Sequence, residues 1–262
     1  MLAEQPAQGT DQVCLPTSPQ AAAPLPPRIL SMLETLDHVT YSIARRPDEI
    51  AFVRRMRYDP YLREGMIRES ADGSVDDPLD TAENAHVVVV SVAGIPCATV
   101  RLHVLDRERR IGPSLVVGRD VVNQHLDAGK VIIDPGKFAA TREATHAYPM
   151  IALYTLRAVA MACVHFGADL VVFAIRPEHG AFYRRIFQAT QWVAPVEYVA
   201  PPLRTVCALY GADVSAGASI AKRNPILLST AGERAGLFEG DGEVPSSVRS
   251  ILVDGAETGI AF

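Results

Sequence analysis

The chain has 262 residues, of which 48% are hydrophobic and 21% charged, the balance of a globular protein with a sizeable core. Its formal net charge of −5 at pH 7 excludes a surface that is basic throughout, so we expect no nucleic-acid partner. The sequence also lacks a bilayer-length apolar run, a secretory signal and cysteines at metal-binding or redox spacing, which predicts a cytoplasmic protein without a membrane span.

The first predicted elements are a leader, a strand and a helix. Residues 1–30 are rich in alanine, proline and glutamine, a composition typical of disorder, and residues 39–44 form an apolar run typical of a strand. A helix opens at residues 47–49, where a proline suits the first turn and two acids complement the helix dipole. Arg57 lies four residues after Val53 and shares its inward-facing stripe, so it needs an anionic partner. The alternative is an arginine at the helix end that extends to solvent.

An acidic loop and a hairpin come next. The loop carries Asp77 and Asp80, and residues 86–92 and 95–104 read as the two strands of the hairpin. Alternation along the second strand places Arg101 on the face opposite its apolar side chains, which we interpret as the ligand side of the sheet. The alternatives are a solvated acidic loop and a solvated strand arginine.

The middle of the chain predicts a parallel crossover. Residues 131–133 form a short apolar strand that we expect to end at the Asp-Pro-Gly of residues 134–136, since proline lacks a donor and glycine adopts unusual dihedrals. A long apolar helix at 150–166 and a buried strand at 170–175 follow. An acid at the end of a strand that leads to a crossover helix lies where α/β sheets bind ligands, which makes Asp134 the first candidate for chemistry.

The last predicted elements are a helix at 181–188 and strands near 192–199 and 205–210. Beyond about residue 213 the chain is rich in glycine and alanine. We therefore expect one α/β domain at 31–212, followed by a tail at 213–262 that docks on it.

This order of elements resembles the GNAT acyltransferase fold, a mixed, splayed β-sheet flanked by helices. Five motifs between about residues 39 and 211 resemble those of N-acyl amino acid synthases and the related acyl-homoserine-lactone synthases. They are Arg57-Tyr-x-x-Tyr61, Asp77-x-x-Asp80, Arg101-Leu, Asp134-x-x-Lys137-Phe138 in place of Glu-x-x-Arg-Phe, and Arg176-Pro-x-His179-x-x-Phe-Tyr183 in place of His-Pro-x-His-x-x-Phe-Tyr. The fourth motif exchanges both its acid and its base.

The resemblance implies that an amine attacks an acyl thioester and gives an amide. A base must take the amine's proton, and Asp134 is the expected base, directly or through a water, with Glu143 as a second candidate. The alternative is that Asp134 only caps its turn or pairs with Lys137. The remaining expected site residues either hold the paired acids in place or bind the acceptor's carboxylate. These residues are Arg57, Tyr61, Asp77, Asp80, Arg101, Lys137 and Phe138.

The acyl donor is inferred from a missing loop. CoA-using members of this fold carry a Gln/Arg-x-x-Gly-x-Gly/Ala loop that cradles the pyrophosphate, and the residues after Gly136 lack it. We therefore expect an acyl carrier protein thioester as co-substrate, and neither a metal nor another cofactor. Carrier proteins are acidic, so a basic cluster is expected to dock one, although these arginines also fit plain surface charge. The cluster comprises Arg142, Arg176, Arg184 and Arg185.

The expected function is therefore transfer of a fatty acyl group from an acyl carrier protein to the amine of an amino acid. Three alternatives stay open: an acyl-homoserine-lactone synthase that uses S-adenosylmethionine, a non-catalytic module that binds an acyl carrier, and a CoA-dependent acetyltransferase.

Overall fold

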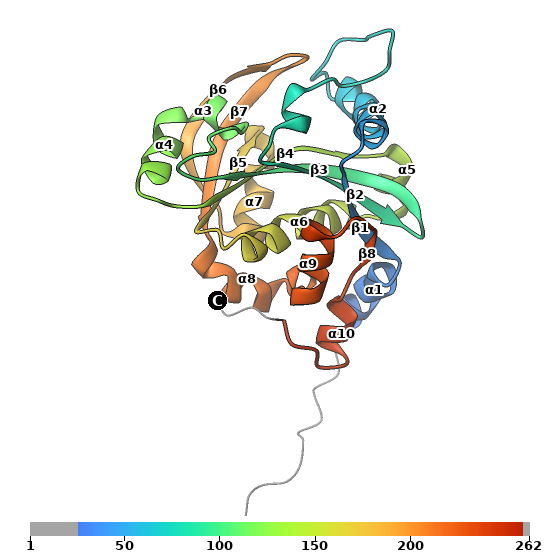
Figure 1. Cartoon of the computed structure of the whole chain (residues 1–262). Helices are drawn as coiled ribbons and strands as arrows, with labels where there is room; N and C mark the ends of the chain where they lie inside the picture. Colours follow the sequence, from blue (N-terminus) through green and yellow to red (C-terminus); the bar gives the residue numbers. More distant parts are fainter. Residues whose placement is uncertain (1–25, 259–262) are drawn as a thin grey trace, which may run out of the picture.

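The computed structural model describes residues 26–258. The predicted leader lies mostly outside these residues, and its last part begins helix α1 (Pro27–Leu36), whose Leu33 and Leu36 are buried. Within the described residues, eight strands form one sheet in the order β6-β7-β5-β4-β3-β2-β1-β8 (Figure 1). Only β4 and β5 pair in parallel. The strands are β1 (Val39–Ala44), β2 (Ala85–Val92), β3 (Ile95–Leu105), β4 (Ile132–Ala140), β5 (Leu170–Ile175), β6 (Thr190–Ala200), β7 (Leu203–Asp213) and β8 (Val244–Pro245).

Helices cover both faces of this sheet and give three layers (Figure 1). One face carries α2 (Pro47–Arg63), the short helix η1 (Pro78–Thr81), α3 (Ser114–Val117) and α4 (Arg119–Asp127). The other carries α1, α6 (Ile151–His165), α7 (Gly180–Phe187), α8 (Gly217–Arg223), α9 (Ala231–Glu239) and α10 (Val248–Leu252), while α5 (Arg142–Ala147) lies at one end. This architecture confirms the predicted mixed α/β class. No helix within residues 26–258 combines the length and the hydropathy that a bilayer crossing requires.

Strands β4 and β5 separate after two pairs of residues. Ile132 and Ile133 pair with β5, after which β4 continues along β3 and β5 continues along β7. The prediction that the strand ends at Asp134 was wrong. Beyond Ile133 the strand pairs on one side only, and such an edge tolerates a proline. One extra residue in β4 opposite β3 forms a bulge, where Lys137 has a positive φ of 55°.

The carboxy-terminal segment, interpreted from the sequence as a tail, packs against α6 and β1. Tyr41 of β1 pairs with Val244 of β8, and the buried Arg157 of α6 donates a hydrogen bond to the carbonyl oxygen of Ile226 at 2.9 Å. Arg157 also forms a buried ion pair with Glu233 of α9, with Nη2 2.7 Å from Oε2. Helices and a strand outside the five motifs thus complete the core.

Glu233→Gln is expected to lower the free energy of unfolding by about 2 kcal/mol, because a hydrogen bond to a buried charged group is worth roughly 1.5–3 kcal/mol. Urea denaturation measures the change. Glu239→Gln on the same helix is the matched control, since the Glu239 side chain is 70% exposed. Equal stability of the two variants would contradict the structural role of the Arg157–Glu233 pair.

Candidate active site

A cavity of about 150 Å³ opens where β4 and β5 separate. Pro135, Gly136, Lys137 and Phe138 of β4 form one wall, and the end of β5 forms the opposite wall. The remaining lining comes from α2 and the segment that follows it, β3, α6, η2 (Pro177–His179), α7 and β7, and it is mainly apolar. The cavity therefore joins an apolar interior to the backbone bulge that carries Lys137.

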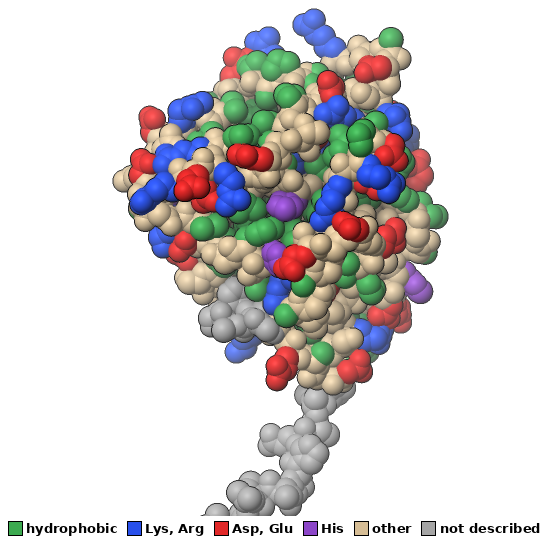
Figure 2. Space-filling view, in the orientation of Figure 1, with side chains coloured by type: hydrophobic (Ala, Val, Ile, Leu, Met, Phe, Trp, Pro, Cys, Tyr) green, Lys and Arg blue, Asp and Glu red, His purple; other side chains and the backbone are tan. Residues whose placement is uncertain are grey.

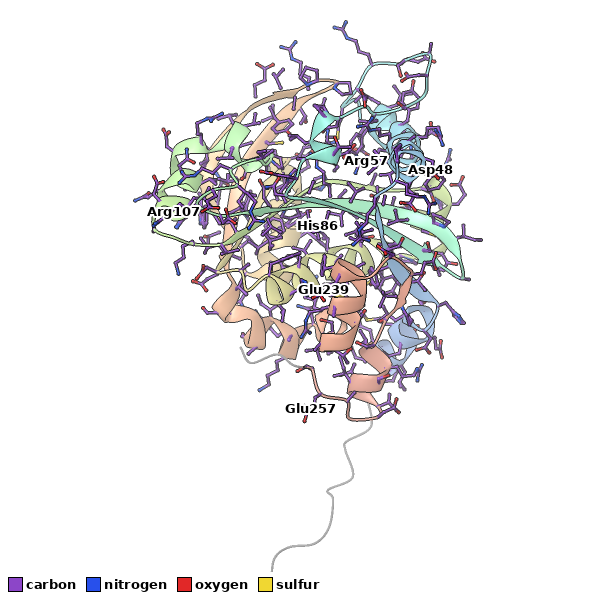
Figure 3. The ribbon with its side chains drawn as sticks, in the orientation of Figure 1. Asp48, Arg57, His86, Arg107, Glu239 and Glu257 are labelled. Carbon is purple, nitrogen blue, oxygen red and sulfur yellow. The ribbon has the colours of Figure 1, made fainter. Side chains whose placement is uncertain are left out.

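Five buried charged side chains form a cluster beside this cavity, named the charge cluster below. Arg57 Nη1 lies 2.7 Å from Asp80 Oδ1, and Arg101 Nη1 lies 3.0 Å from the same oxygen. Asp77 Oδ2 lies 3.2 Å from Arg101 Nη1 and 2.8 Å from Lys137 Nζ. Figure 3 shows Arg57 on the α2 side of the sheet. The structure thus brings together the arginine of α2, the paired acids, the arginine of β3 and the lysine of β4.

The charge cluster holds three cations and two carboxylates. Burial opposes the ionisation of Asp77, but Arg101 and Lys137 outweigh it and lower the pKa of Asp77 to about 2. Arg57 and Arg101 likewise outweigh the burial of Asp80 and lower its pKa. Burial lowers the pKa of Lys137 to about 8, although Asp77 acts in the opposite direction. When Lys137 loses its proton, two arginines balance two carboxylates; when it holds one, the cluster carries one surplus positive charge.

Two further features bear on what the charge cluster could bind. The Nε and Nη2 atoms of Arg57 and Arg101 are buried and have no hydrogen-bond partner among the described residues. Lys137 is the one member of the charge cluster that lines the cavity, and its Nζ atom is buried against Asp77. Buried donors without partners are costly, and they leave the charge cluster with an unused capacity to bind an anion.

Asp134 lies in β4 directly before the residues that form this wall. Its side chain is fully buried, its Oδ2 accepts a hydrogen bond from the Ser114 amide at 2.8 Å, and any side chain at Gly112 would collide with it. It is not among the residues that line the cavity, although its neighbour Pro135 is. Burial raises the pKa of Asp134 to about 7, against the effect of its hydrogen bond to Ser114.

The raised pKa of Asp134 predicts a pH-dependent stability. The folded protein retains a proton that the unfolded chain has lost above its ordinary pKa of 3.8, so this contribution is full below pH 3.8 and disappears as pH rises through about 7. Between pH 5 and pH 6.5, we expect the free energy of unfolding of the wild type to fall by about 2 kcal/mol relative to Asp134→Asn. Paired urea titrations test this, and a difference that does not change with pH would contradict it.

The other predicted site residues divide into two groups. Tyr61 and Phe138 line the cavity, and Tyr61 donates a hydrogen bond to the Phe138 carbonyl oxygen at 3.2 Å. Glu143 and Arg142 are exposed on α5 and do not line it, so the structure separates the second candidate base from the charge cluster.

The predicted carrier-docking arginines do not form one patch. Arg176 lines the cavity and is paired with Glu64, at 2.8 Å, and with Glu178. Arg184 and Arg185 instead line a separate groove of about 630 Å³, together with Arg28 and other side chains of α1 and of the segment after α8. No acidic side chain in the described part of the chain lines this groove.

Ten of the fourteen cavity residues were not among the predicted site residues, among them His179, Tyr183, Leu156 and Cys207. His179 and Tyr183 stand in the motif that begins at Arg176, so that motif was an available signal. The sequence held no comparable signal for Leu156 and Cys207, because the residues of an apolar cavity wall and those of a plain core follow the same sequence pattern. Among residues 26–258, no group of three or more histidine, cysteine or acidic side chains is arranged to hold a metal.

Comparison with known proteins places this site in a family context. Residues 53–207 match the family model of the N-acyl amino acid synthase FeeM. The structure of FeeM, an N-acyl amino acid synthase from uncultured soil microbes, superposes with a TM-score of 0.56 and 17% identity, over 68% of this chain and 91% of FeeM. The acyl-homoserine-lactone synthase LasI gives a TM-score of 0.51 and 12% identity, over 68% of this chain and 91% of LasI. These structures show a shared fold. No curated protein sequence matches the chain.

Proposed function

The chain belongs to the FeeM family of N-acyl amino acid synthases and is an N-acyltransferase, and from this premise we propose that it moves an acyl group from an acyl carrier protein to an amino acid. One observation carries the proposal: a mainly apolar cavity ends at Lys137, beside a buried charge cluster that gains a surplus positive charge when this lysine is protonated. The apolar part suits an acyl chain, and the charged end suits a carboxylate.

An amino acid enters as a zwitterion, with a carboxylate and an ammonium group one carbon apart. Neutral Lys137 takes a proton from the ammonium group, which activates the amine, and the resulting lysine cation pairs with the substrate carboxylate. Its pKa of about 8 suits proton transfer from an amine near neutral pH. A single side chain thus serves as base and anchor, and the charge of the cluster stays balanced throughout.

The free amine then attacks the thioester carbonyl carbon. A carbon–nitrogen bond forms, the carbon–sulfur bond breaks, and the excess proton on nitrogen passes to the departing thiolate, which leaves as a thiol. We assign the base to Lys137 rather than to Asp134 because only Lys137 lines the cavity. Asp134 has a positioning role, since it holds the turn at Ser114 through a hydrogen bond.

The groove beside α7 supports a carrier protein as donor. Arg184 and Arg185 line it together with Arg28, Arg223 and several apolar side chains, a combination that complements an acidic helix with an apolar stripe. The face shown in Figure 2, by contrast, mixes acidic and basic side chains over its whole area.

The function is tested with purified protein, one acyl chain on either carrier protein or CoA, and a mixture of amino acids that includes S-adenosylmethionine. We expect N-acyl amino acids by mass spectrometry, formed faster from the carrier thioester. Arg184→Glu with Arg185→Glu is expected to raise KM for the carrier thioester only. Arg55→Glu with Arg119→Glu, which reverses two exposed charges on the opposite face, is the matched control. The absence of any N-acyl amino acid with a verified donor would overturn the proposal.

A further inference from the structure

A second apolar cavity of about 50 Å³ follows the first along the same two helices. Helix α6 contributes Leu156 to the first cavity and Ala160 to the second. Helix α7 contributes Tyr183 to the first and Phe187 to the second. In each helix the two residues are four positions apart and so lie on one face, about one turn from each other. The two cavities are therefore successive compartments between the same elements.

Strand β5 shows what separates them. Ile175 lines the first cavity and Val171 the second, and the two share one face of the strand with Phe173 between them. The Phe173 side chain is buried, and its ring centroid lies 4.6 Å from that of Tyr183 and 5.0 Å from that of Phe187. Tyr183 lines the first cavity and Phe187 the second, and the Phe173 ring, which lines neither, packs against both of these rings.

We propose that Phe173 is the partition that limits the length of the acyl chain, a role that rests on the proposed acyltransferase function. The chain enters the first cavity with its thioester at Lys137 and its tail directed along α6 towards Phe173. Methylene groups gain by burial only while the cavity has room for them. A chain that reaches the Phe173 ring has no further room, whereas a chain that passed it would enter the second cavity.

Phe173→Ala joins the compartments and is expected to move the preferred chain towards longer acyl groups by about four methylenes, the length of one helical turn of about 5.4 Å. Two readouts are used: the chain-length profile of turnover, and the affinity for a graded series of N-acyl amino acids, which does not depend on turnover. Phe238→Ala is the matched control, because it truncates a buried phenylalanine whose ring packs against His86, His165 and Phe166 instead. Phe173→Leu is the milder variant should the alanine variant not fold, and it is expected to give a smaller shift in the same direction.

Ala160→Leu fills the second cavity and provides the reverse test. Added to Phe173→Ala, it is expected to restore the wild-type profile, and alone it is expected to change nothing. A shortened profile from Ala160→Leu alone would show that the wild-type chain already passes Phe173, and would overturn the partition. Unchanged affinities and turnover profiles in both Phe173 variants would also overturn it. If the wild type makes no N-acyl product while the affinity series still shifts in Phe173→Ala, the proposed function fails and the partition stands.

Discussion

Lys137→Arg is expected to lower kcat/KM by about 10²- to 10⁴-fold, the usual contribution of a positioned acid–base group. Arginine keeps the positive charge that pairs with Asp77, so the ion pair is retained and the protein stays folded. It does not release its proton at the pH of the reaction, so it cannot accept one from the substrate ammonium group. The wild-type kcat/KM should rise with pH through about 8, the pKa of Lys137, and this rise should disappear in the variant.

Lys130→Arg is the control, because it makes the same exchange at a lysine whose side chain is 47% exposed.

A double variant separates the two candidate bases, Asp134 and Lys137. The family pattern Glu-x-x-Arg-Phe has a longer acid and an arginine where this chain has Asp134 and Lys137. If the two exchanges compensate each other, Asp134→Glu with Lys137→Arg should recover part of the lost activity. Full activity of Lys137→Arg alone would show that Lys137 is not the base.

Asp80→Asn is expected to destabilise the protein by about 3–5 kcal/mol, the cost of removing one partner from a buried ion pair. The Asp80 carboxylate contacts Arg57 at 2.7 Å, Arg101 at 3.0 Å and Arg54 at 3.3 Å. Its loss leaves two fully buried guanidinium groups with one remaining carboxylate. Urea denaturation measures the stability, and activity should be lost together with the ordered cluster.

Asp76→Asn, four residues earlier, is the matched control. The Asp76 side chain is 73% exposed and pairs only with Arg54 among the described residues, so its loss should change stability by no more than about 0.5 kcal/mol. An Asp80→Asn protein as stable as Asp76→Asn would show that the charge cluster does not hold η1 to the sheet.

The charge cluster could be predicted from the sequence because ionisable residues within apolar patterns need partners. Arg57 shares the stripe of Val53 and therefore needed an anionic partner, whereas Arg101 was linked to the paired acids by its resemblance to the family motifs. Asp77 and Asp80, which precede the hairpin, were the available carboxylates. The fold could also be predicted from the order of the elements, because a hairpin followed by a parallel crossover can be arranged in one sheet in only a few ways.

Other features depended on contacts that local patterns do not encode. The bulge at Lys137 lies where β4 no longer has β5 as a neighbour, and Lys137 rather than Asp134 lines the cavity. The packing of the carboxy-terminal segment depends on Arg157, one arginine within an apolar helix. Phe173 reads as ordinary core, and only the positions of the two cavities distinguish it.

The structure of the protein with a bound N-acyl amino acid tests the central claim most directly, namely that the separation of β4 and β5 is the site of acyl transfer. The account predicts the acyl chain between these strands, its end at Phe173, and the carboxylate within hydrogen-bond distance of Lys137 Nζ. A product bound in the groove of Arg184 and Arg185, or one with its carboxylate remote from Lys137, would contradict it.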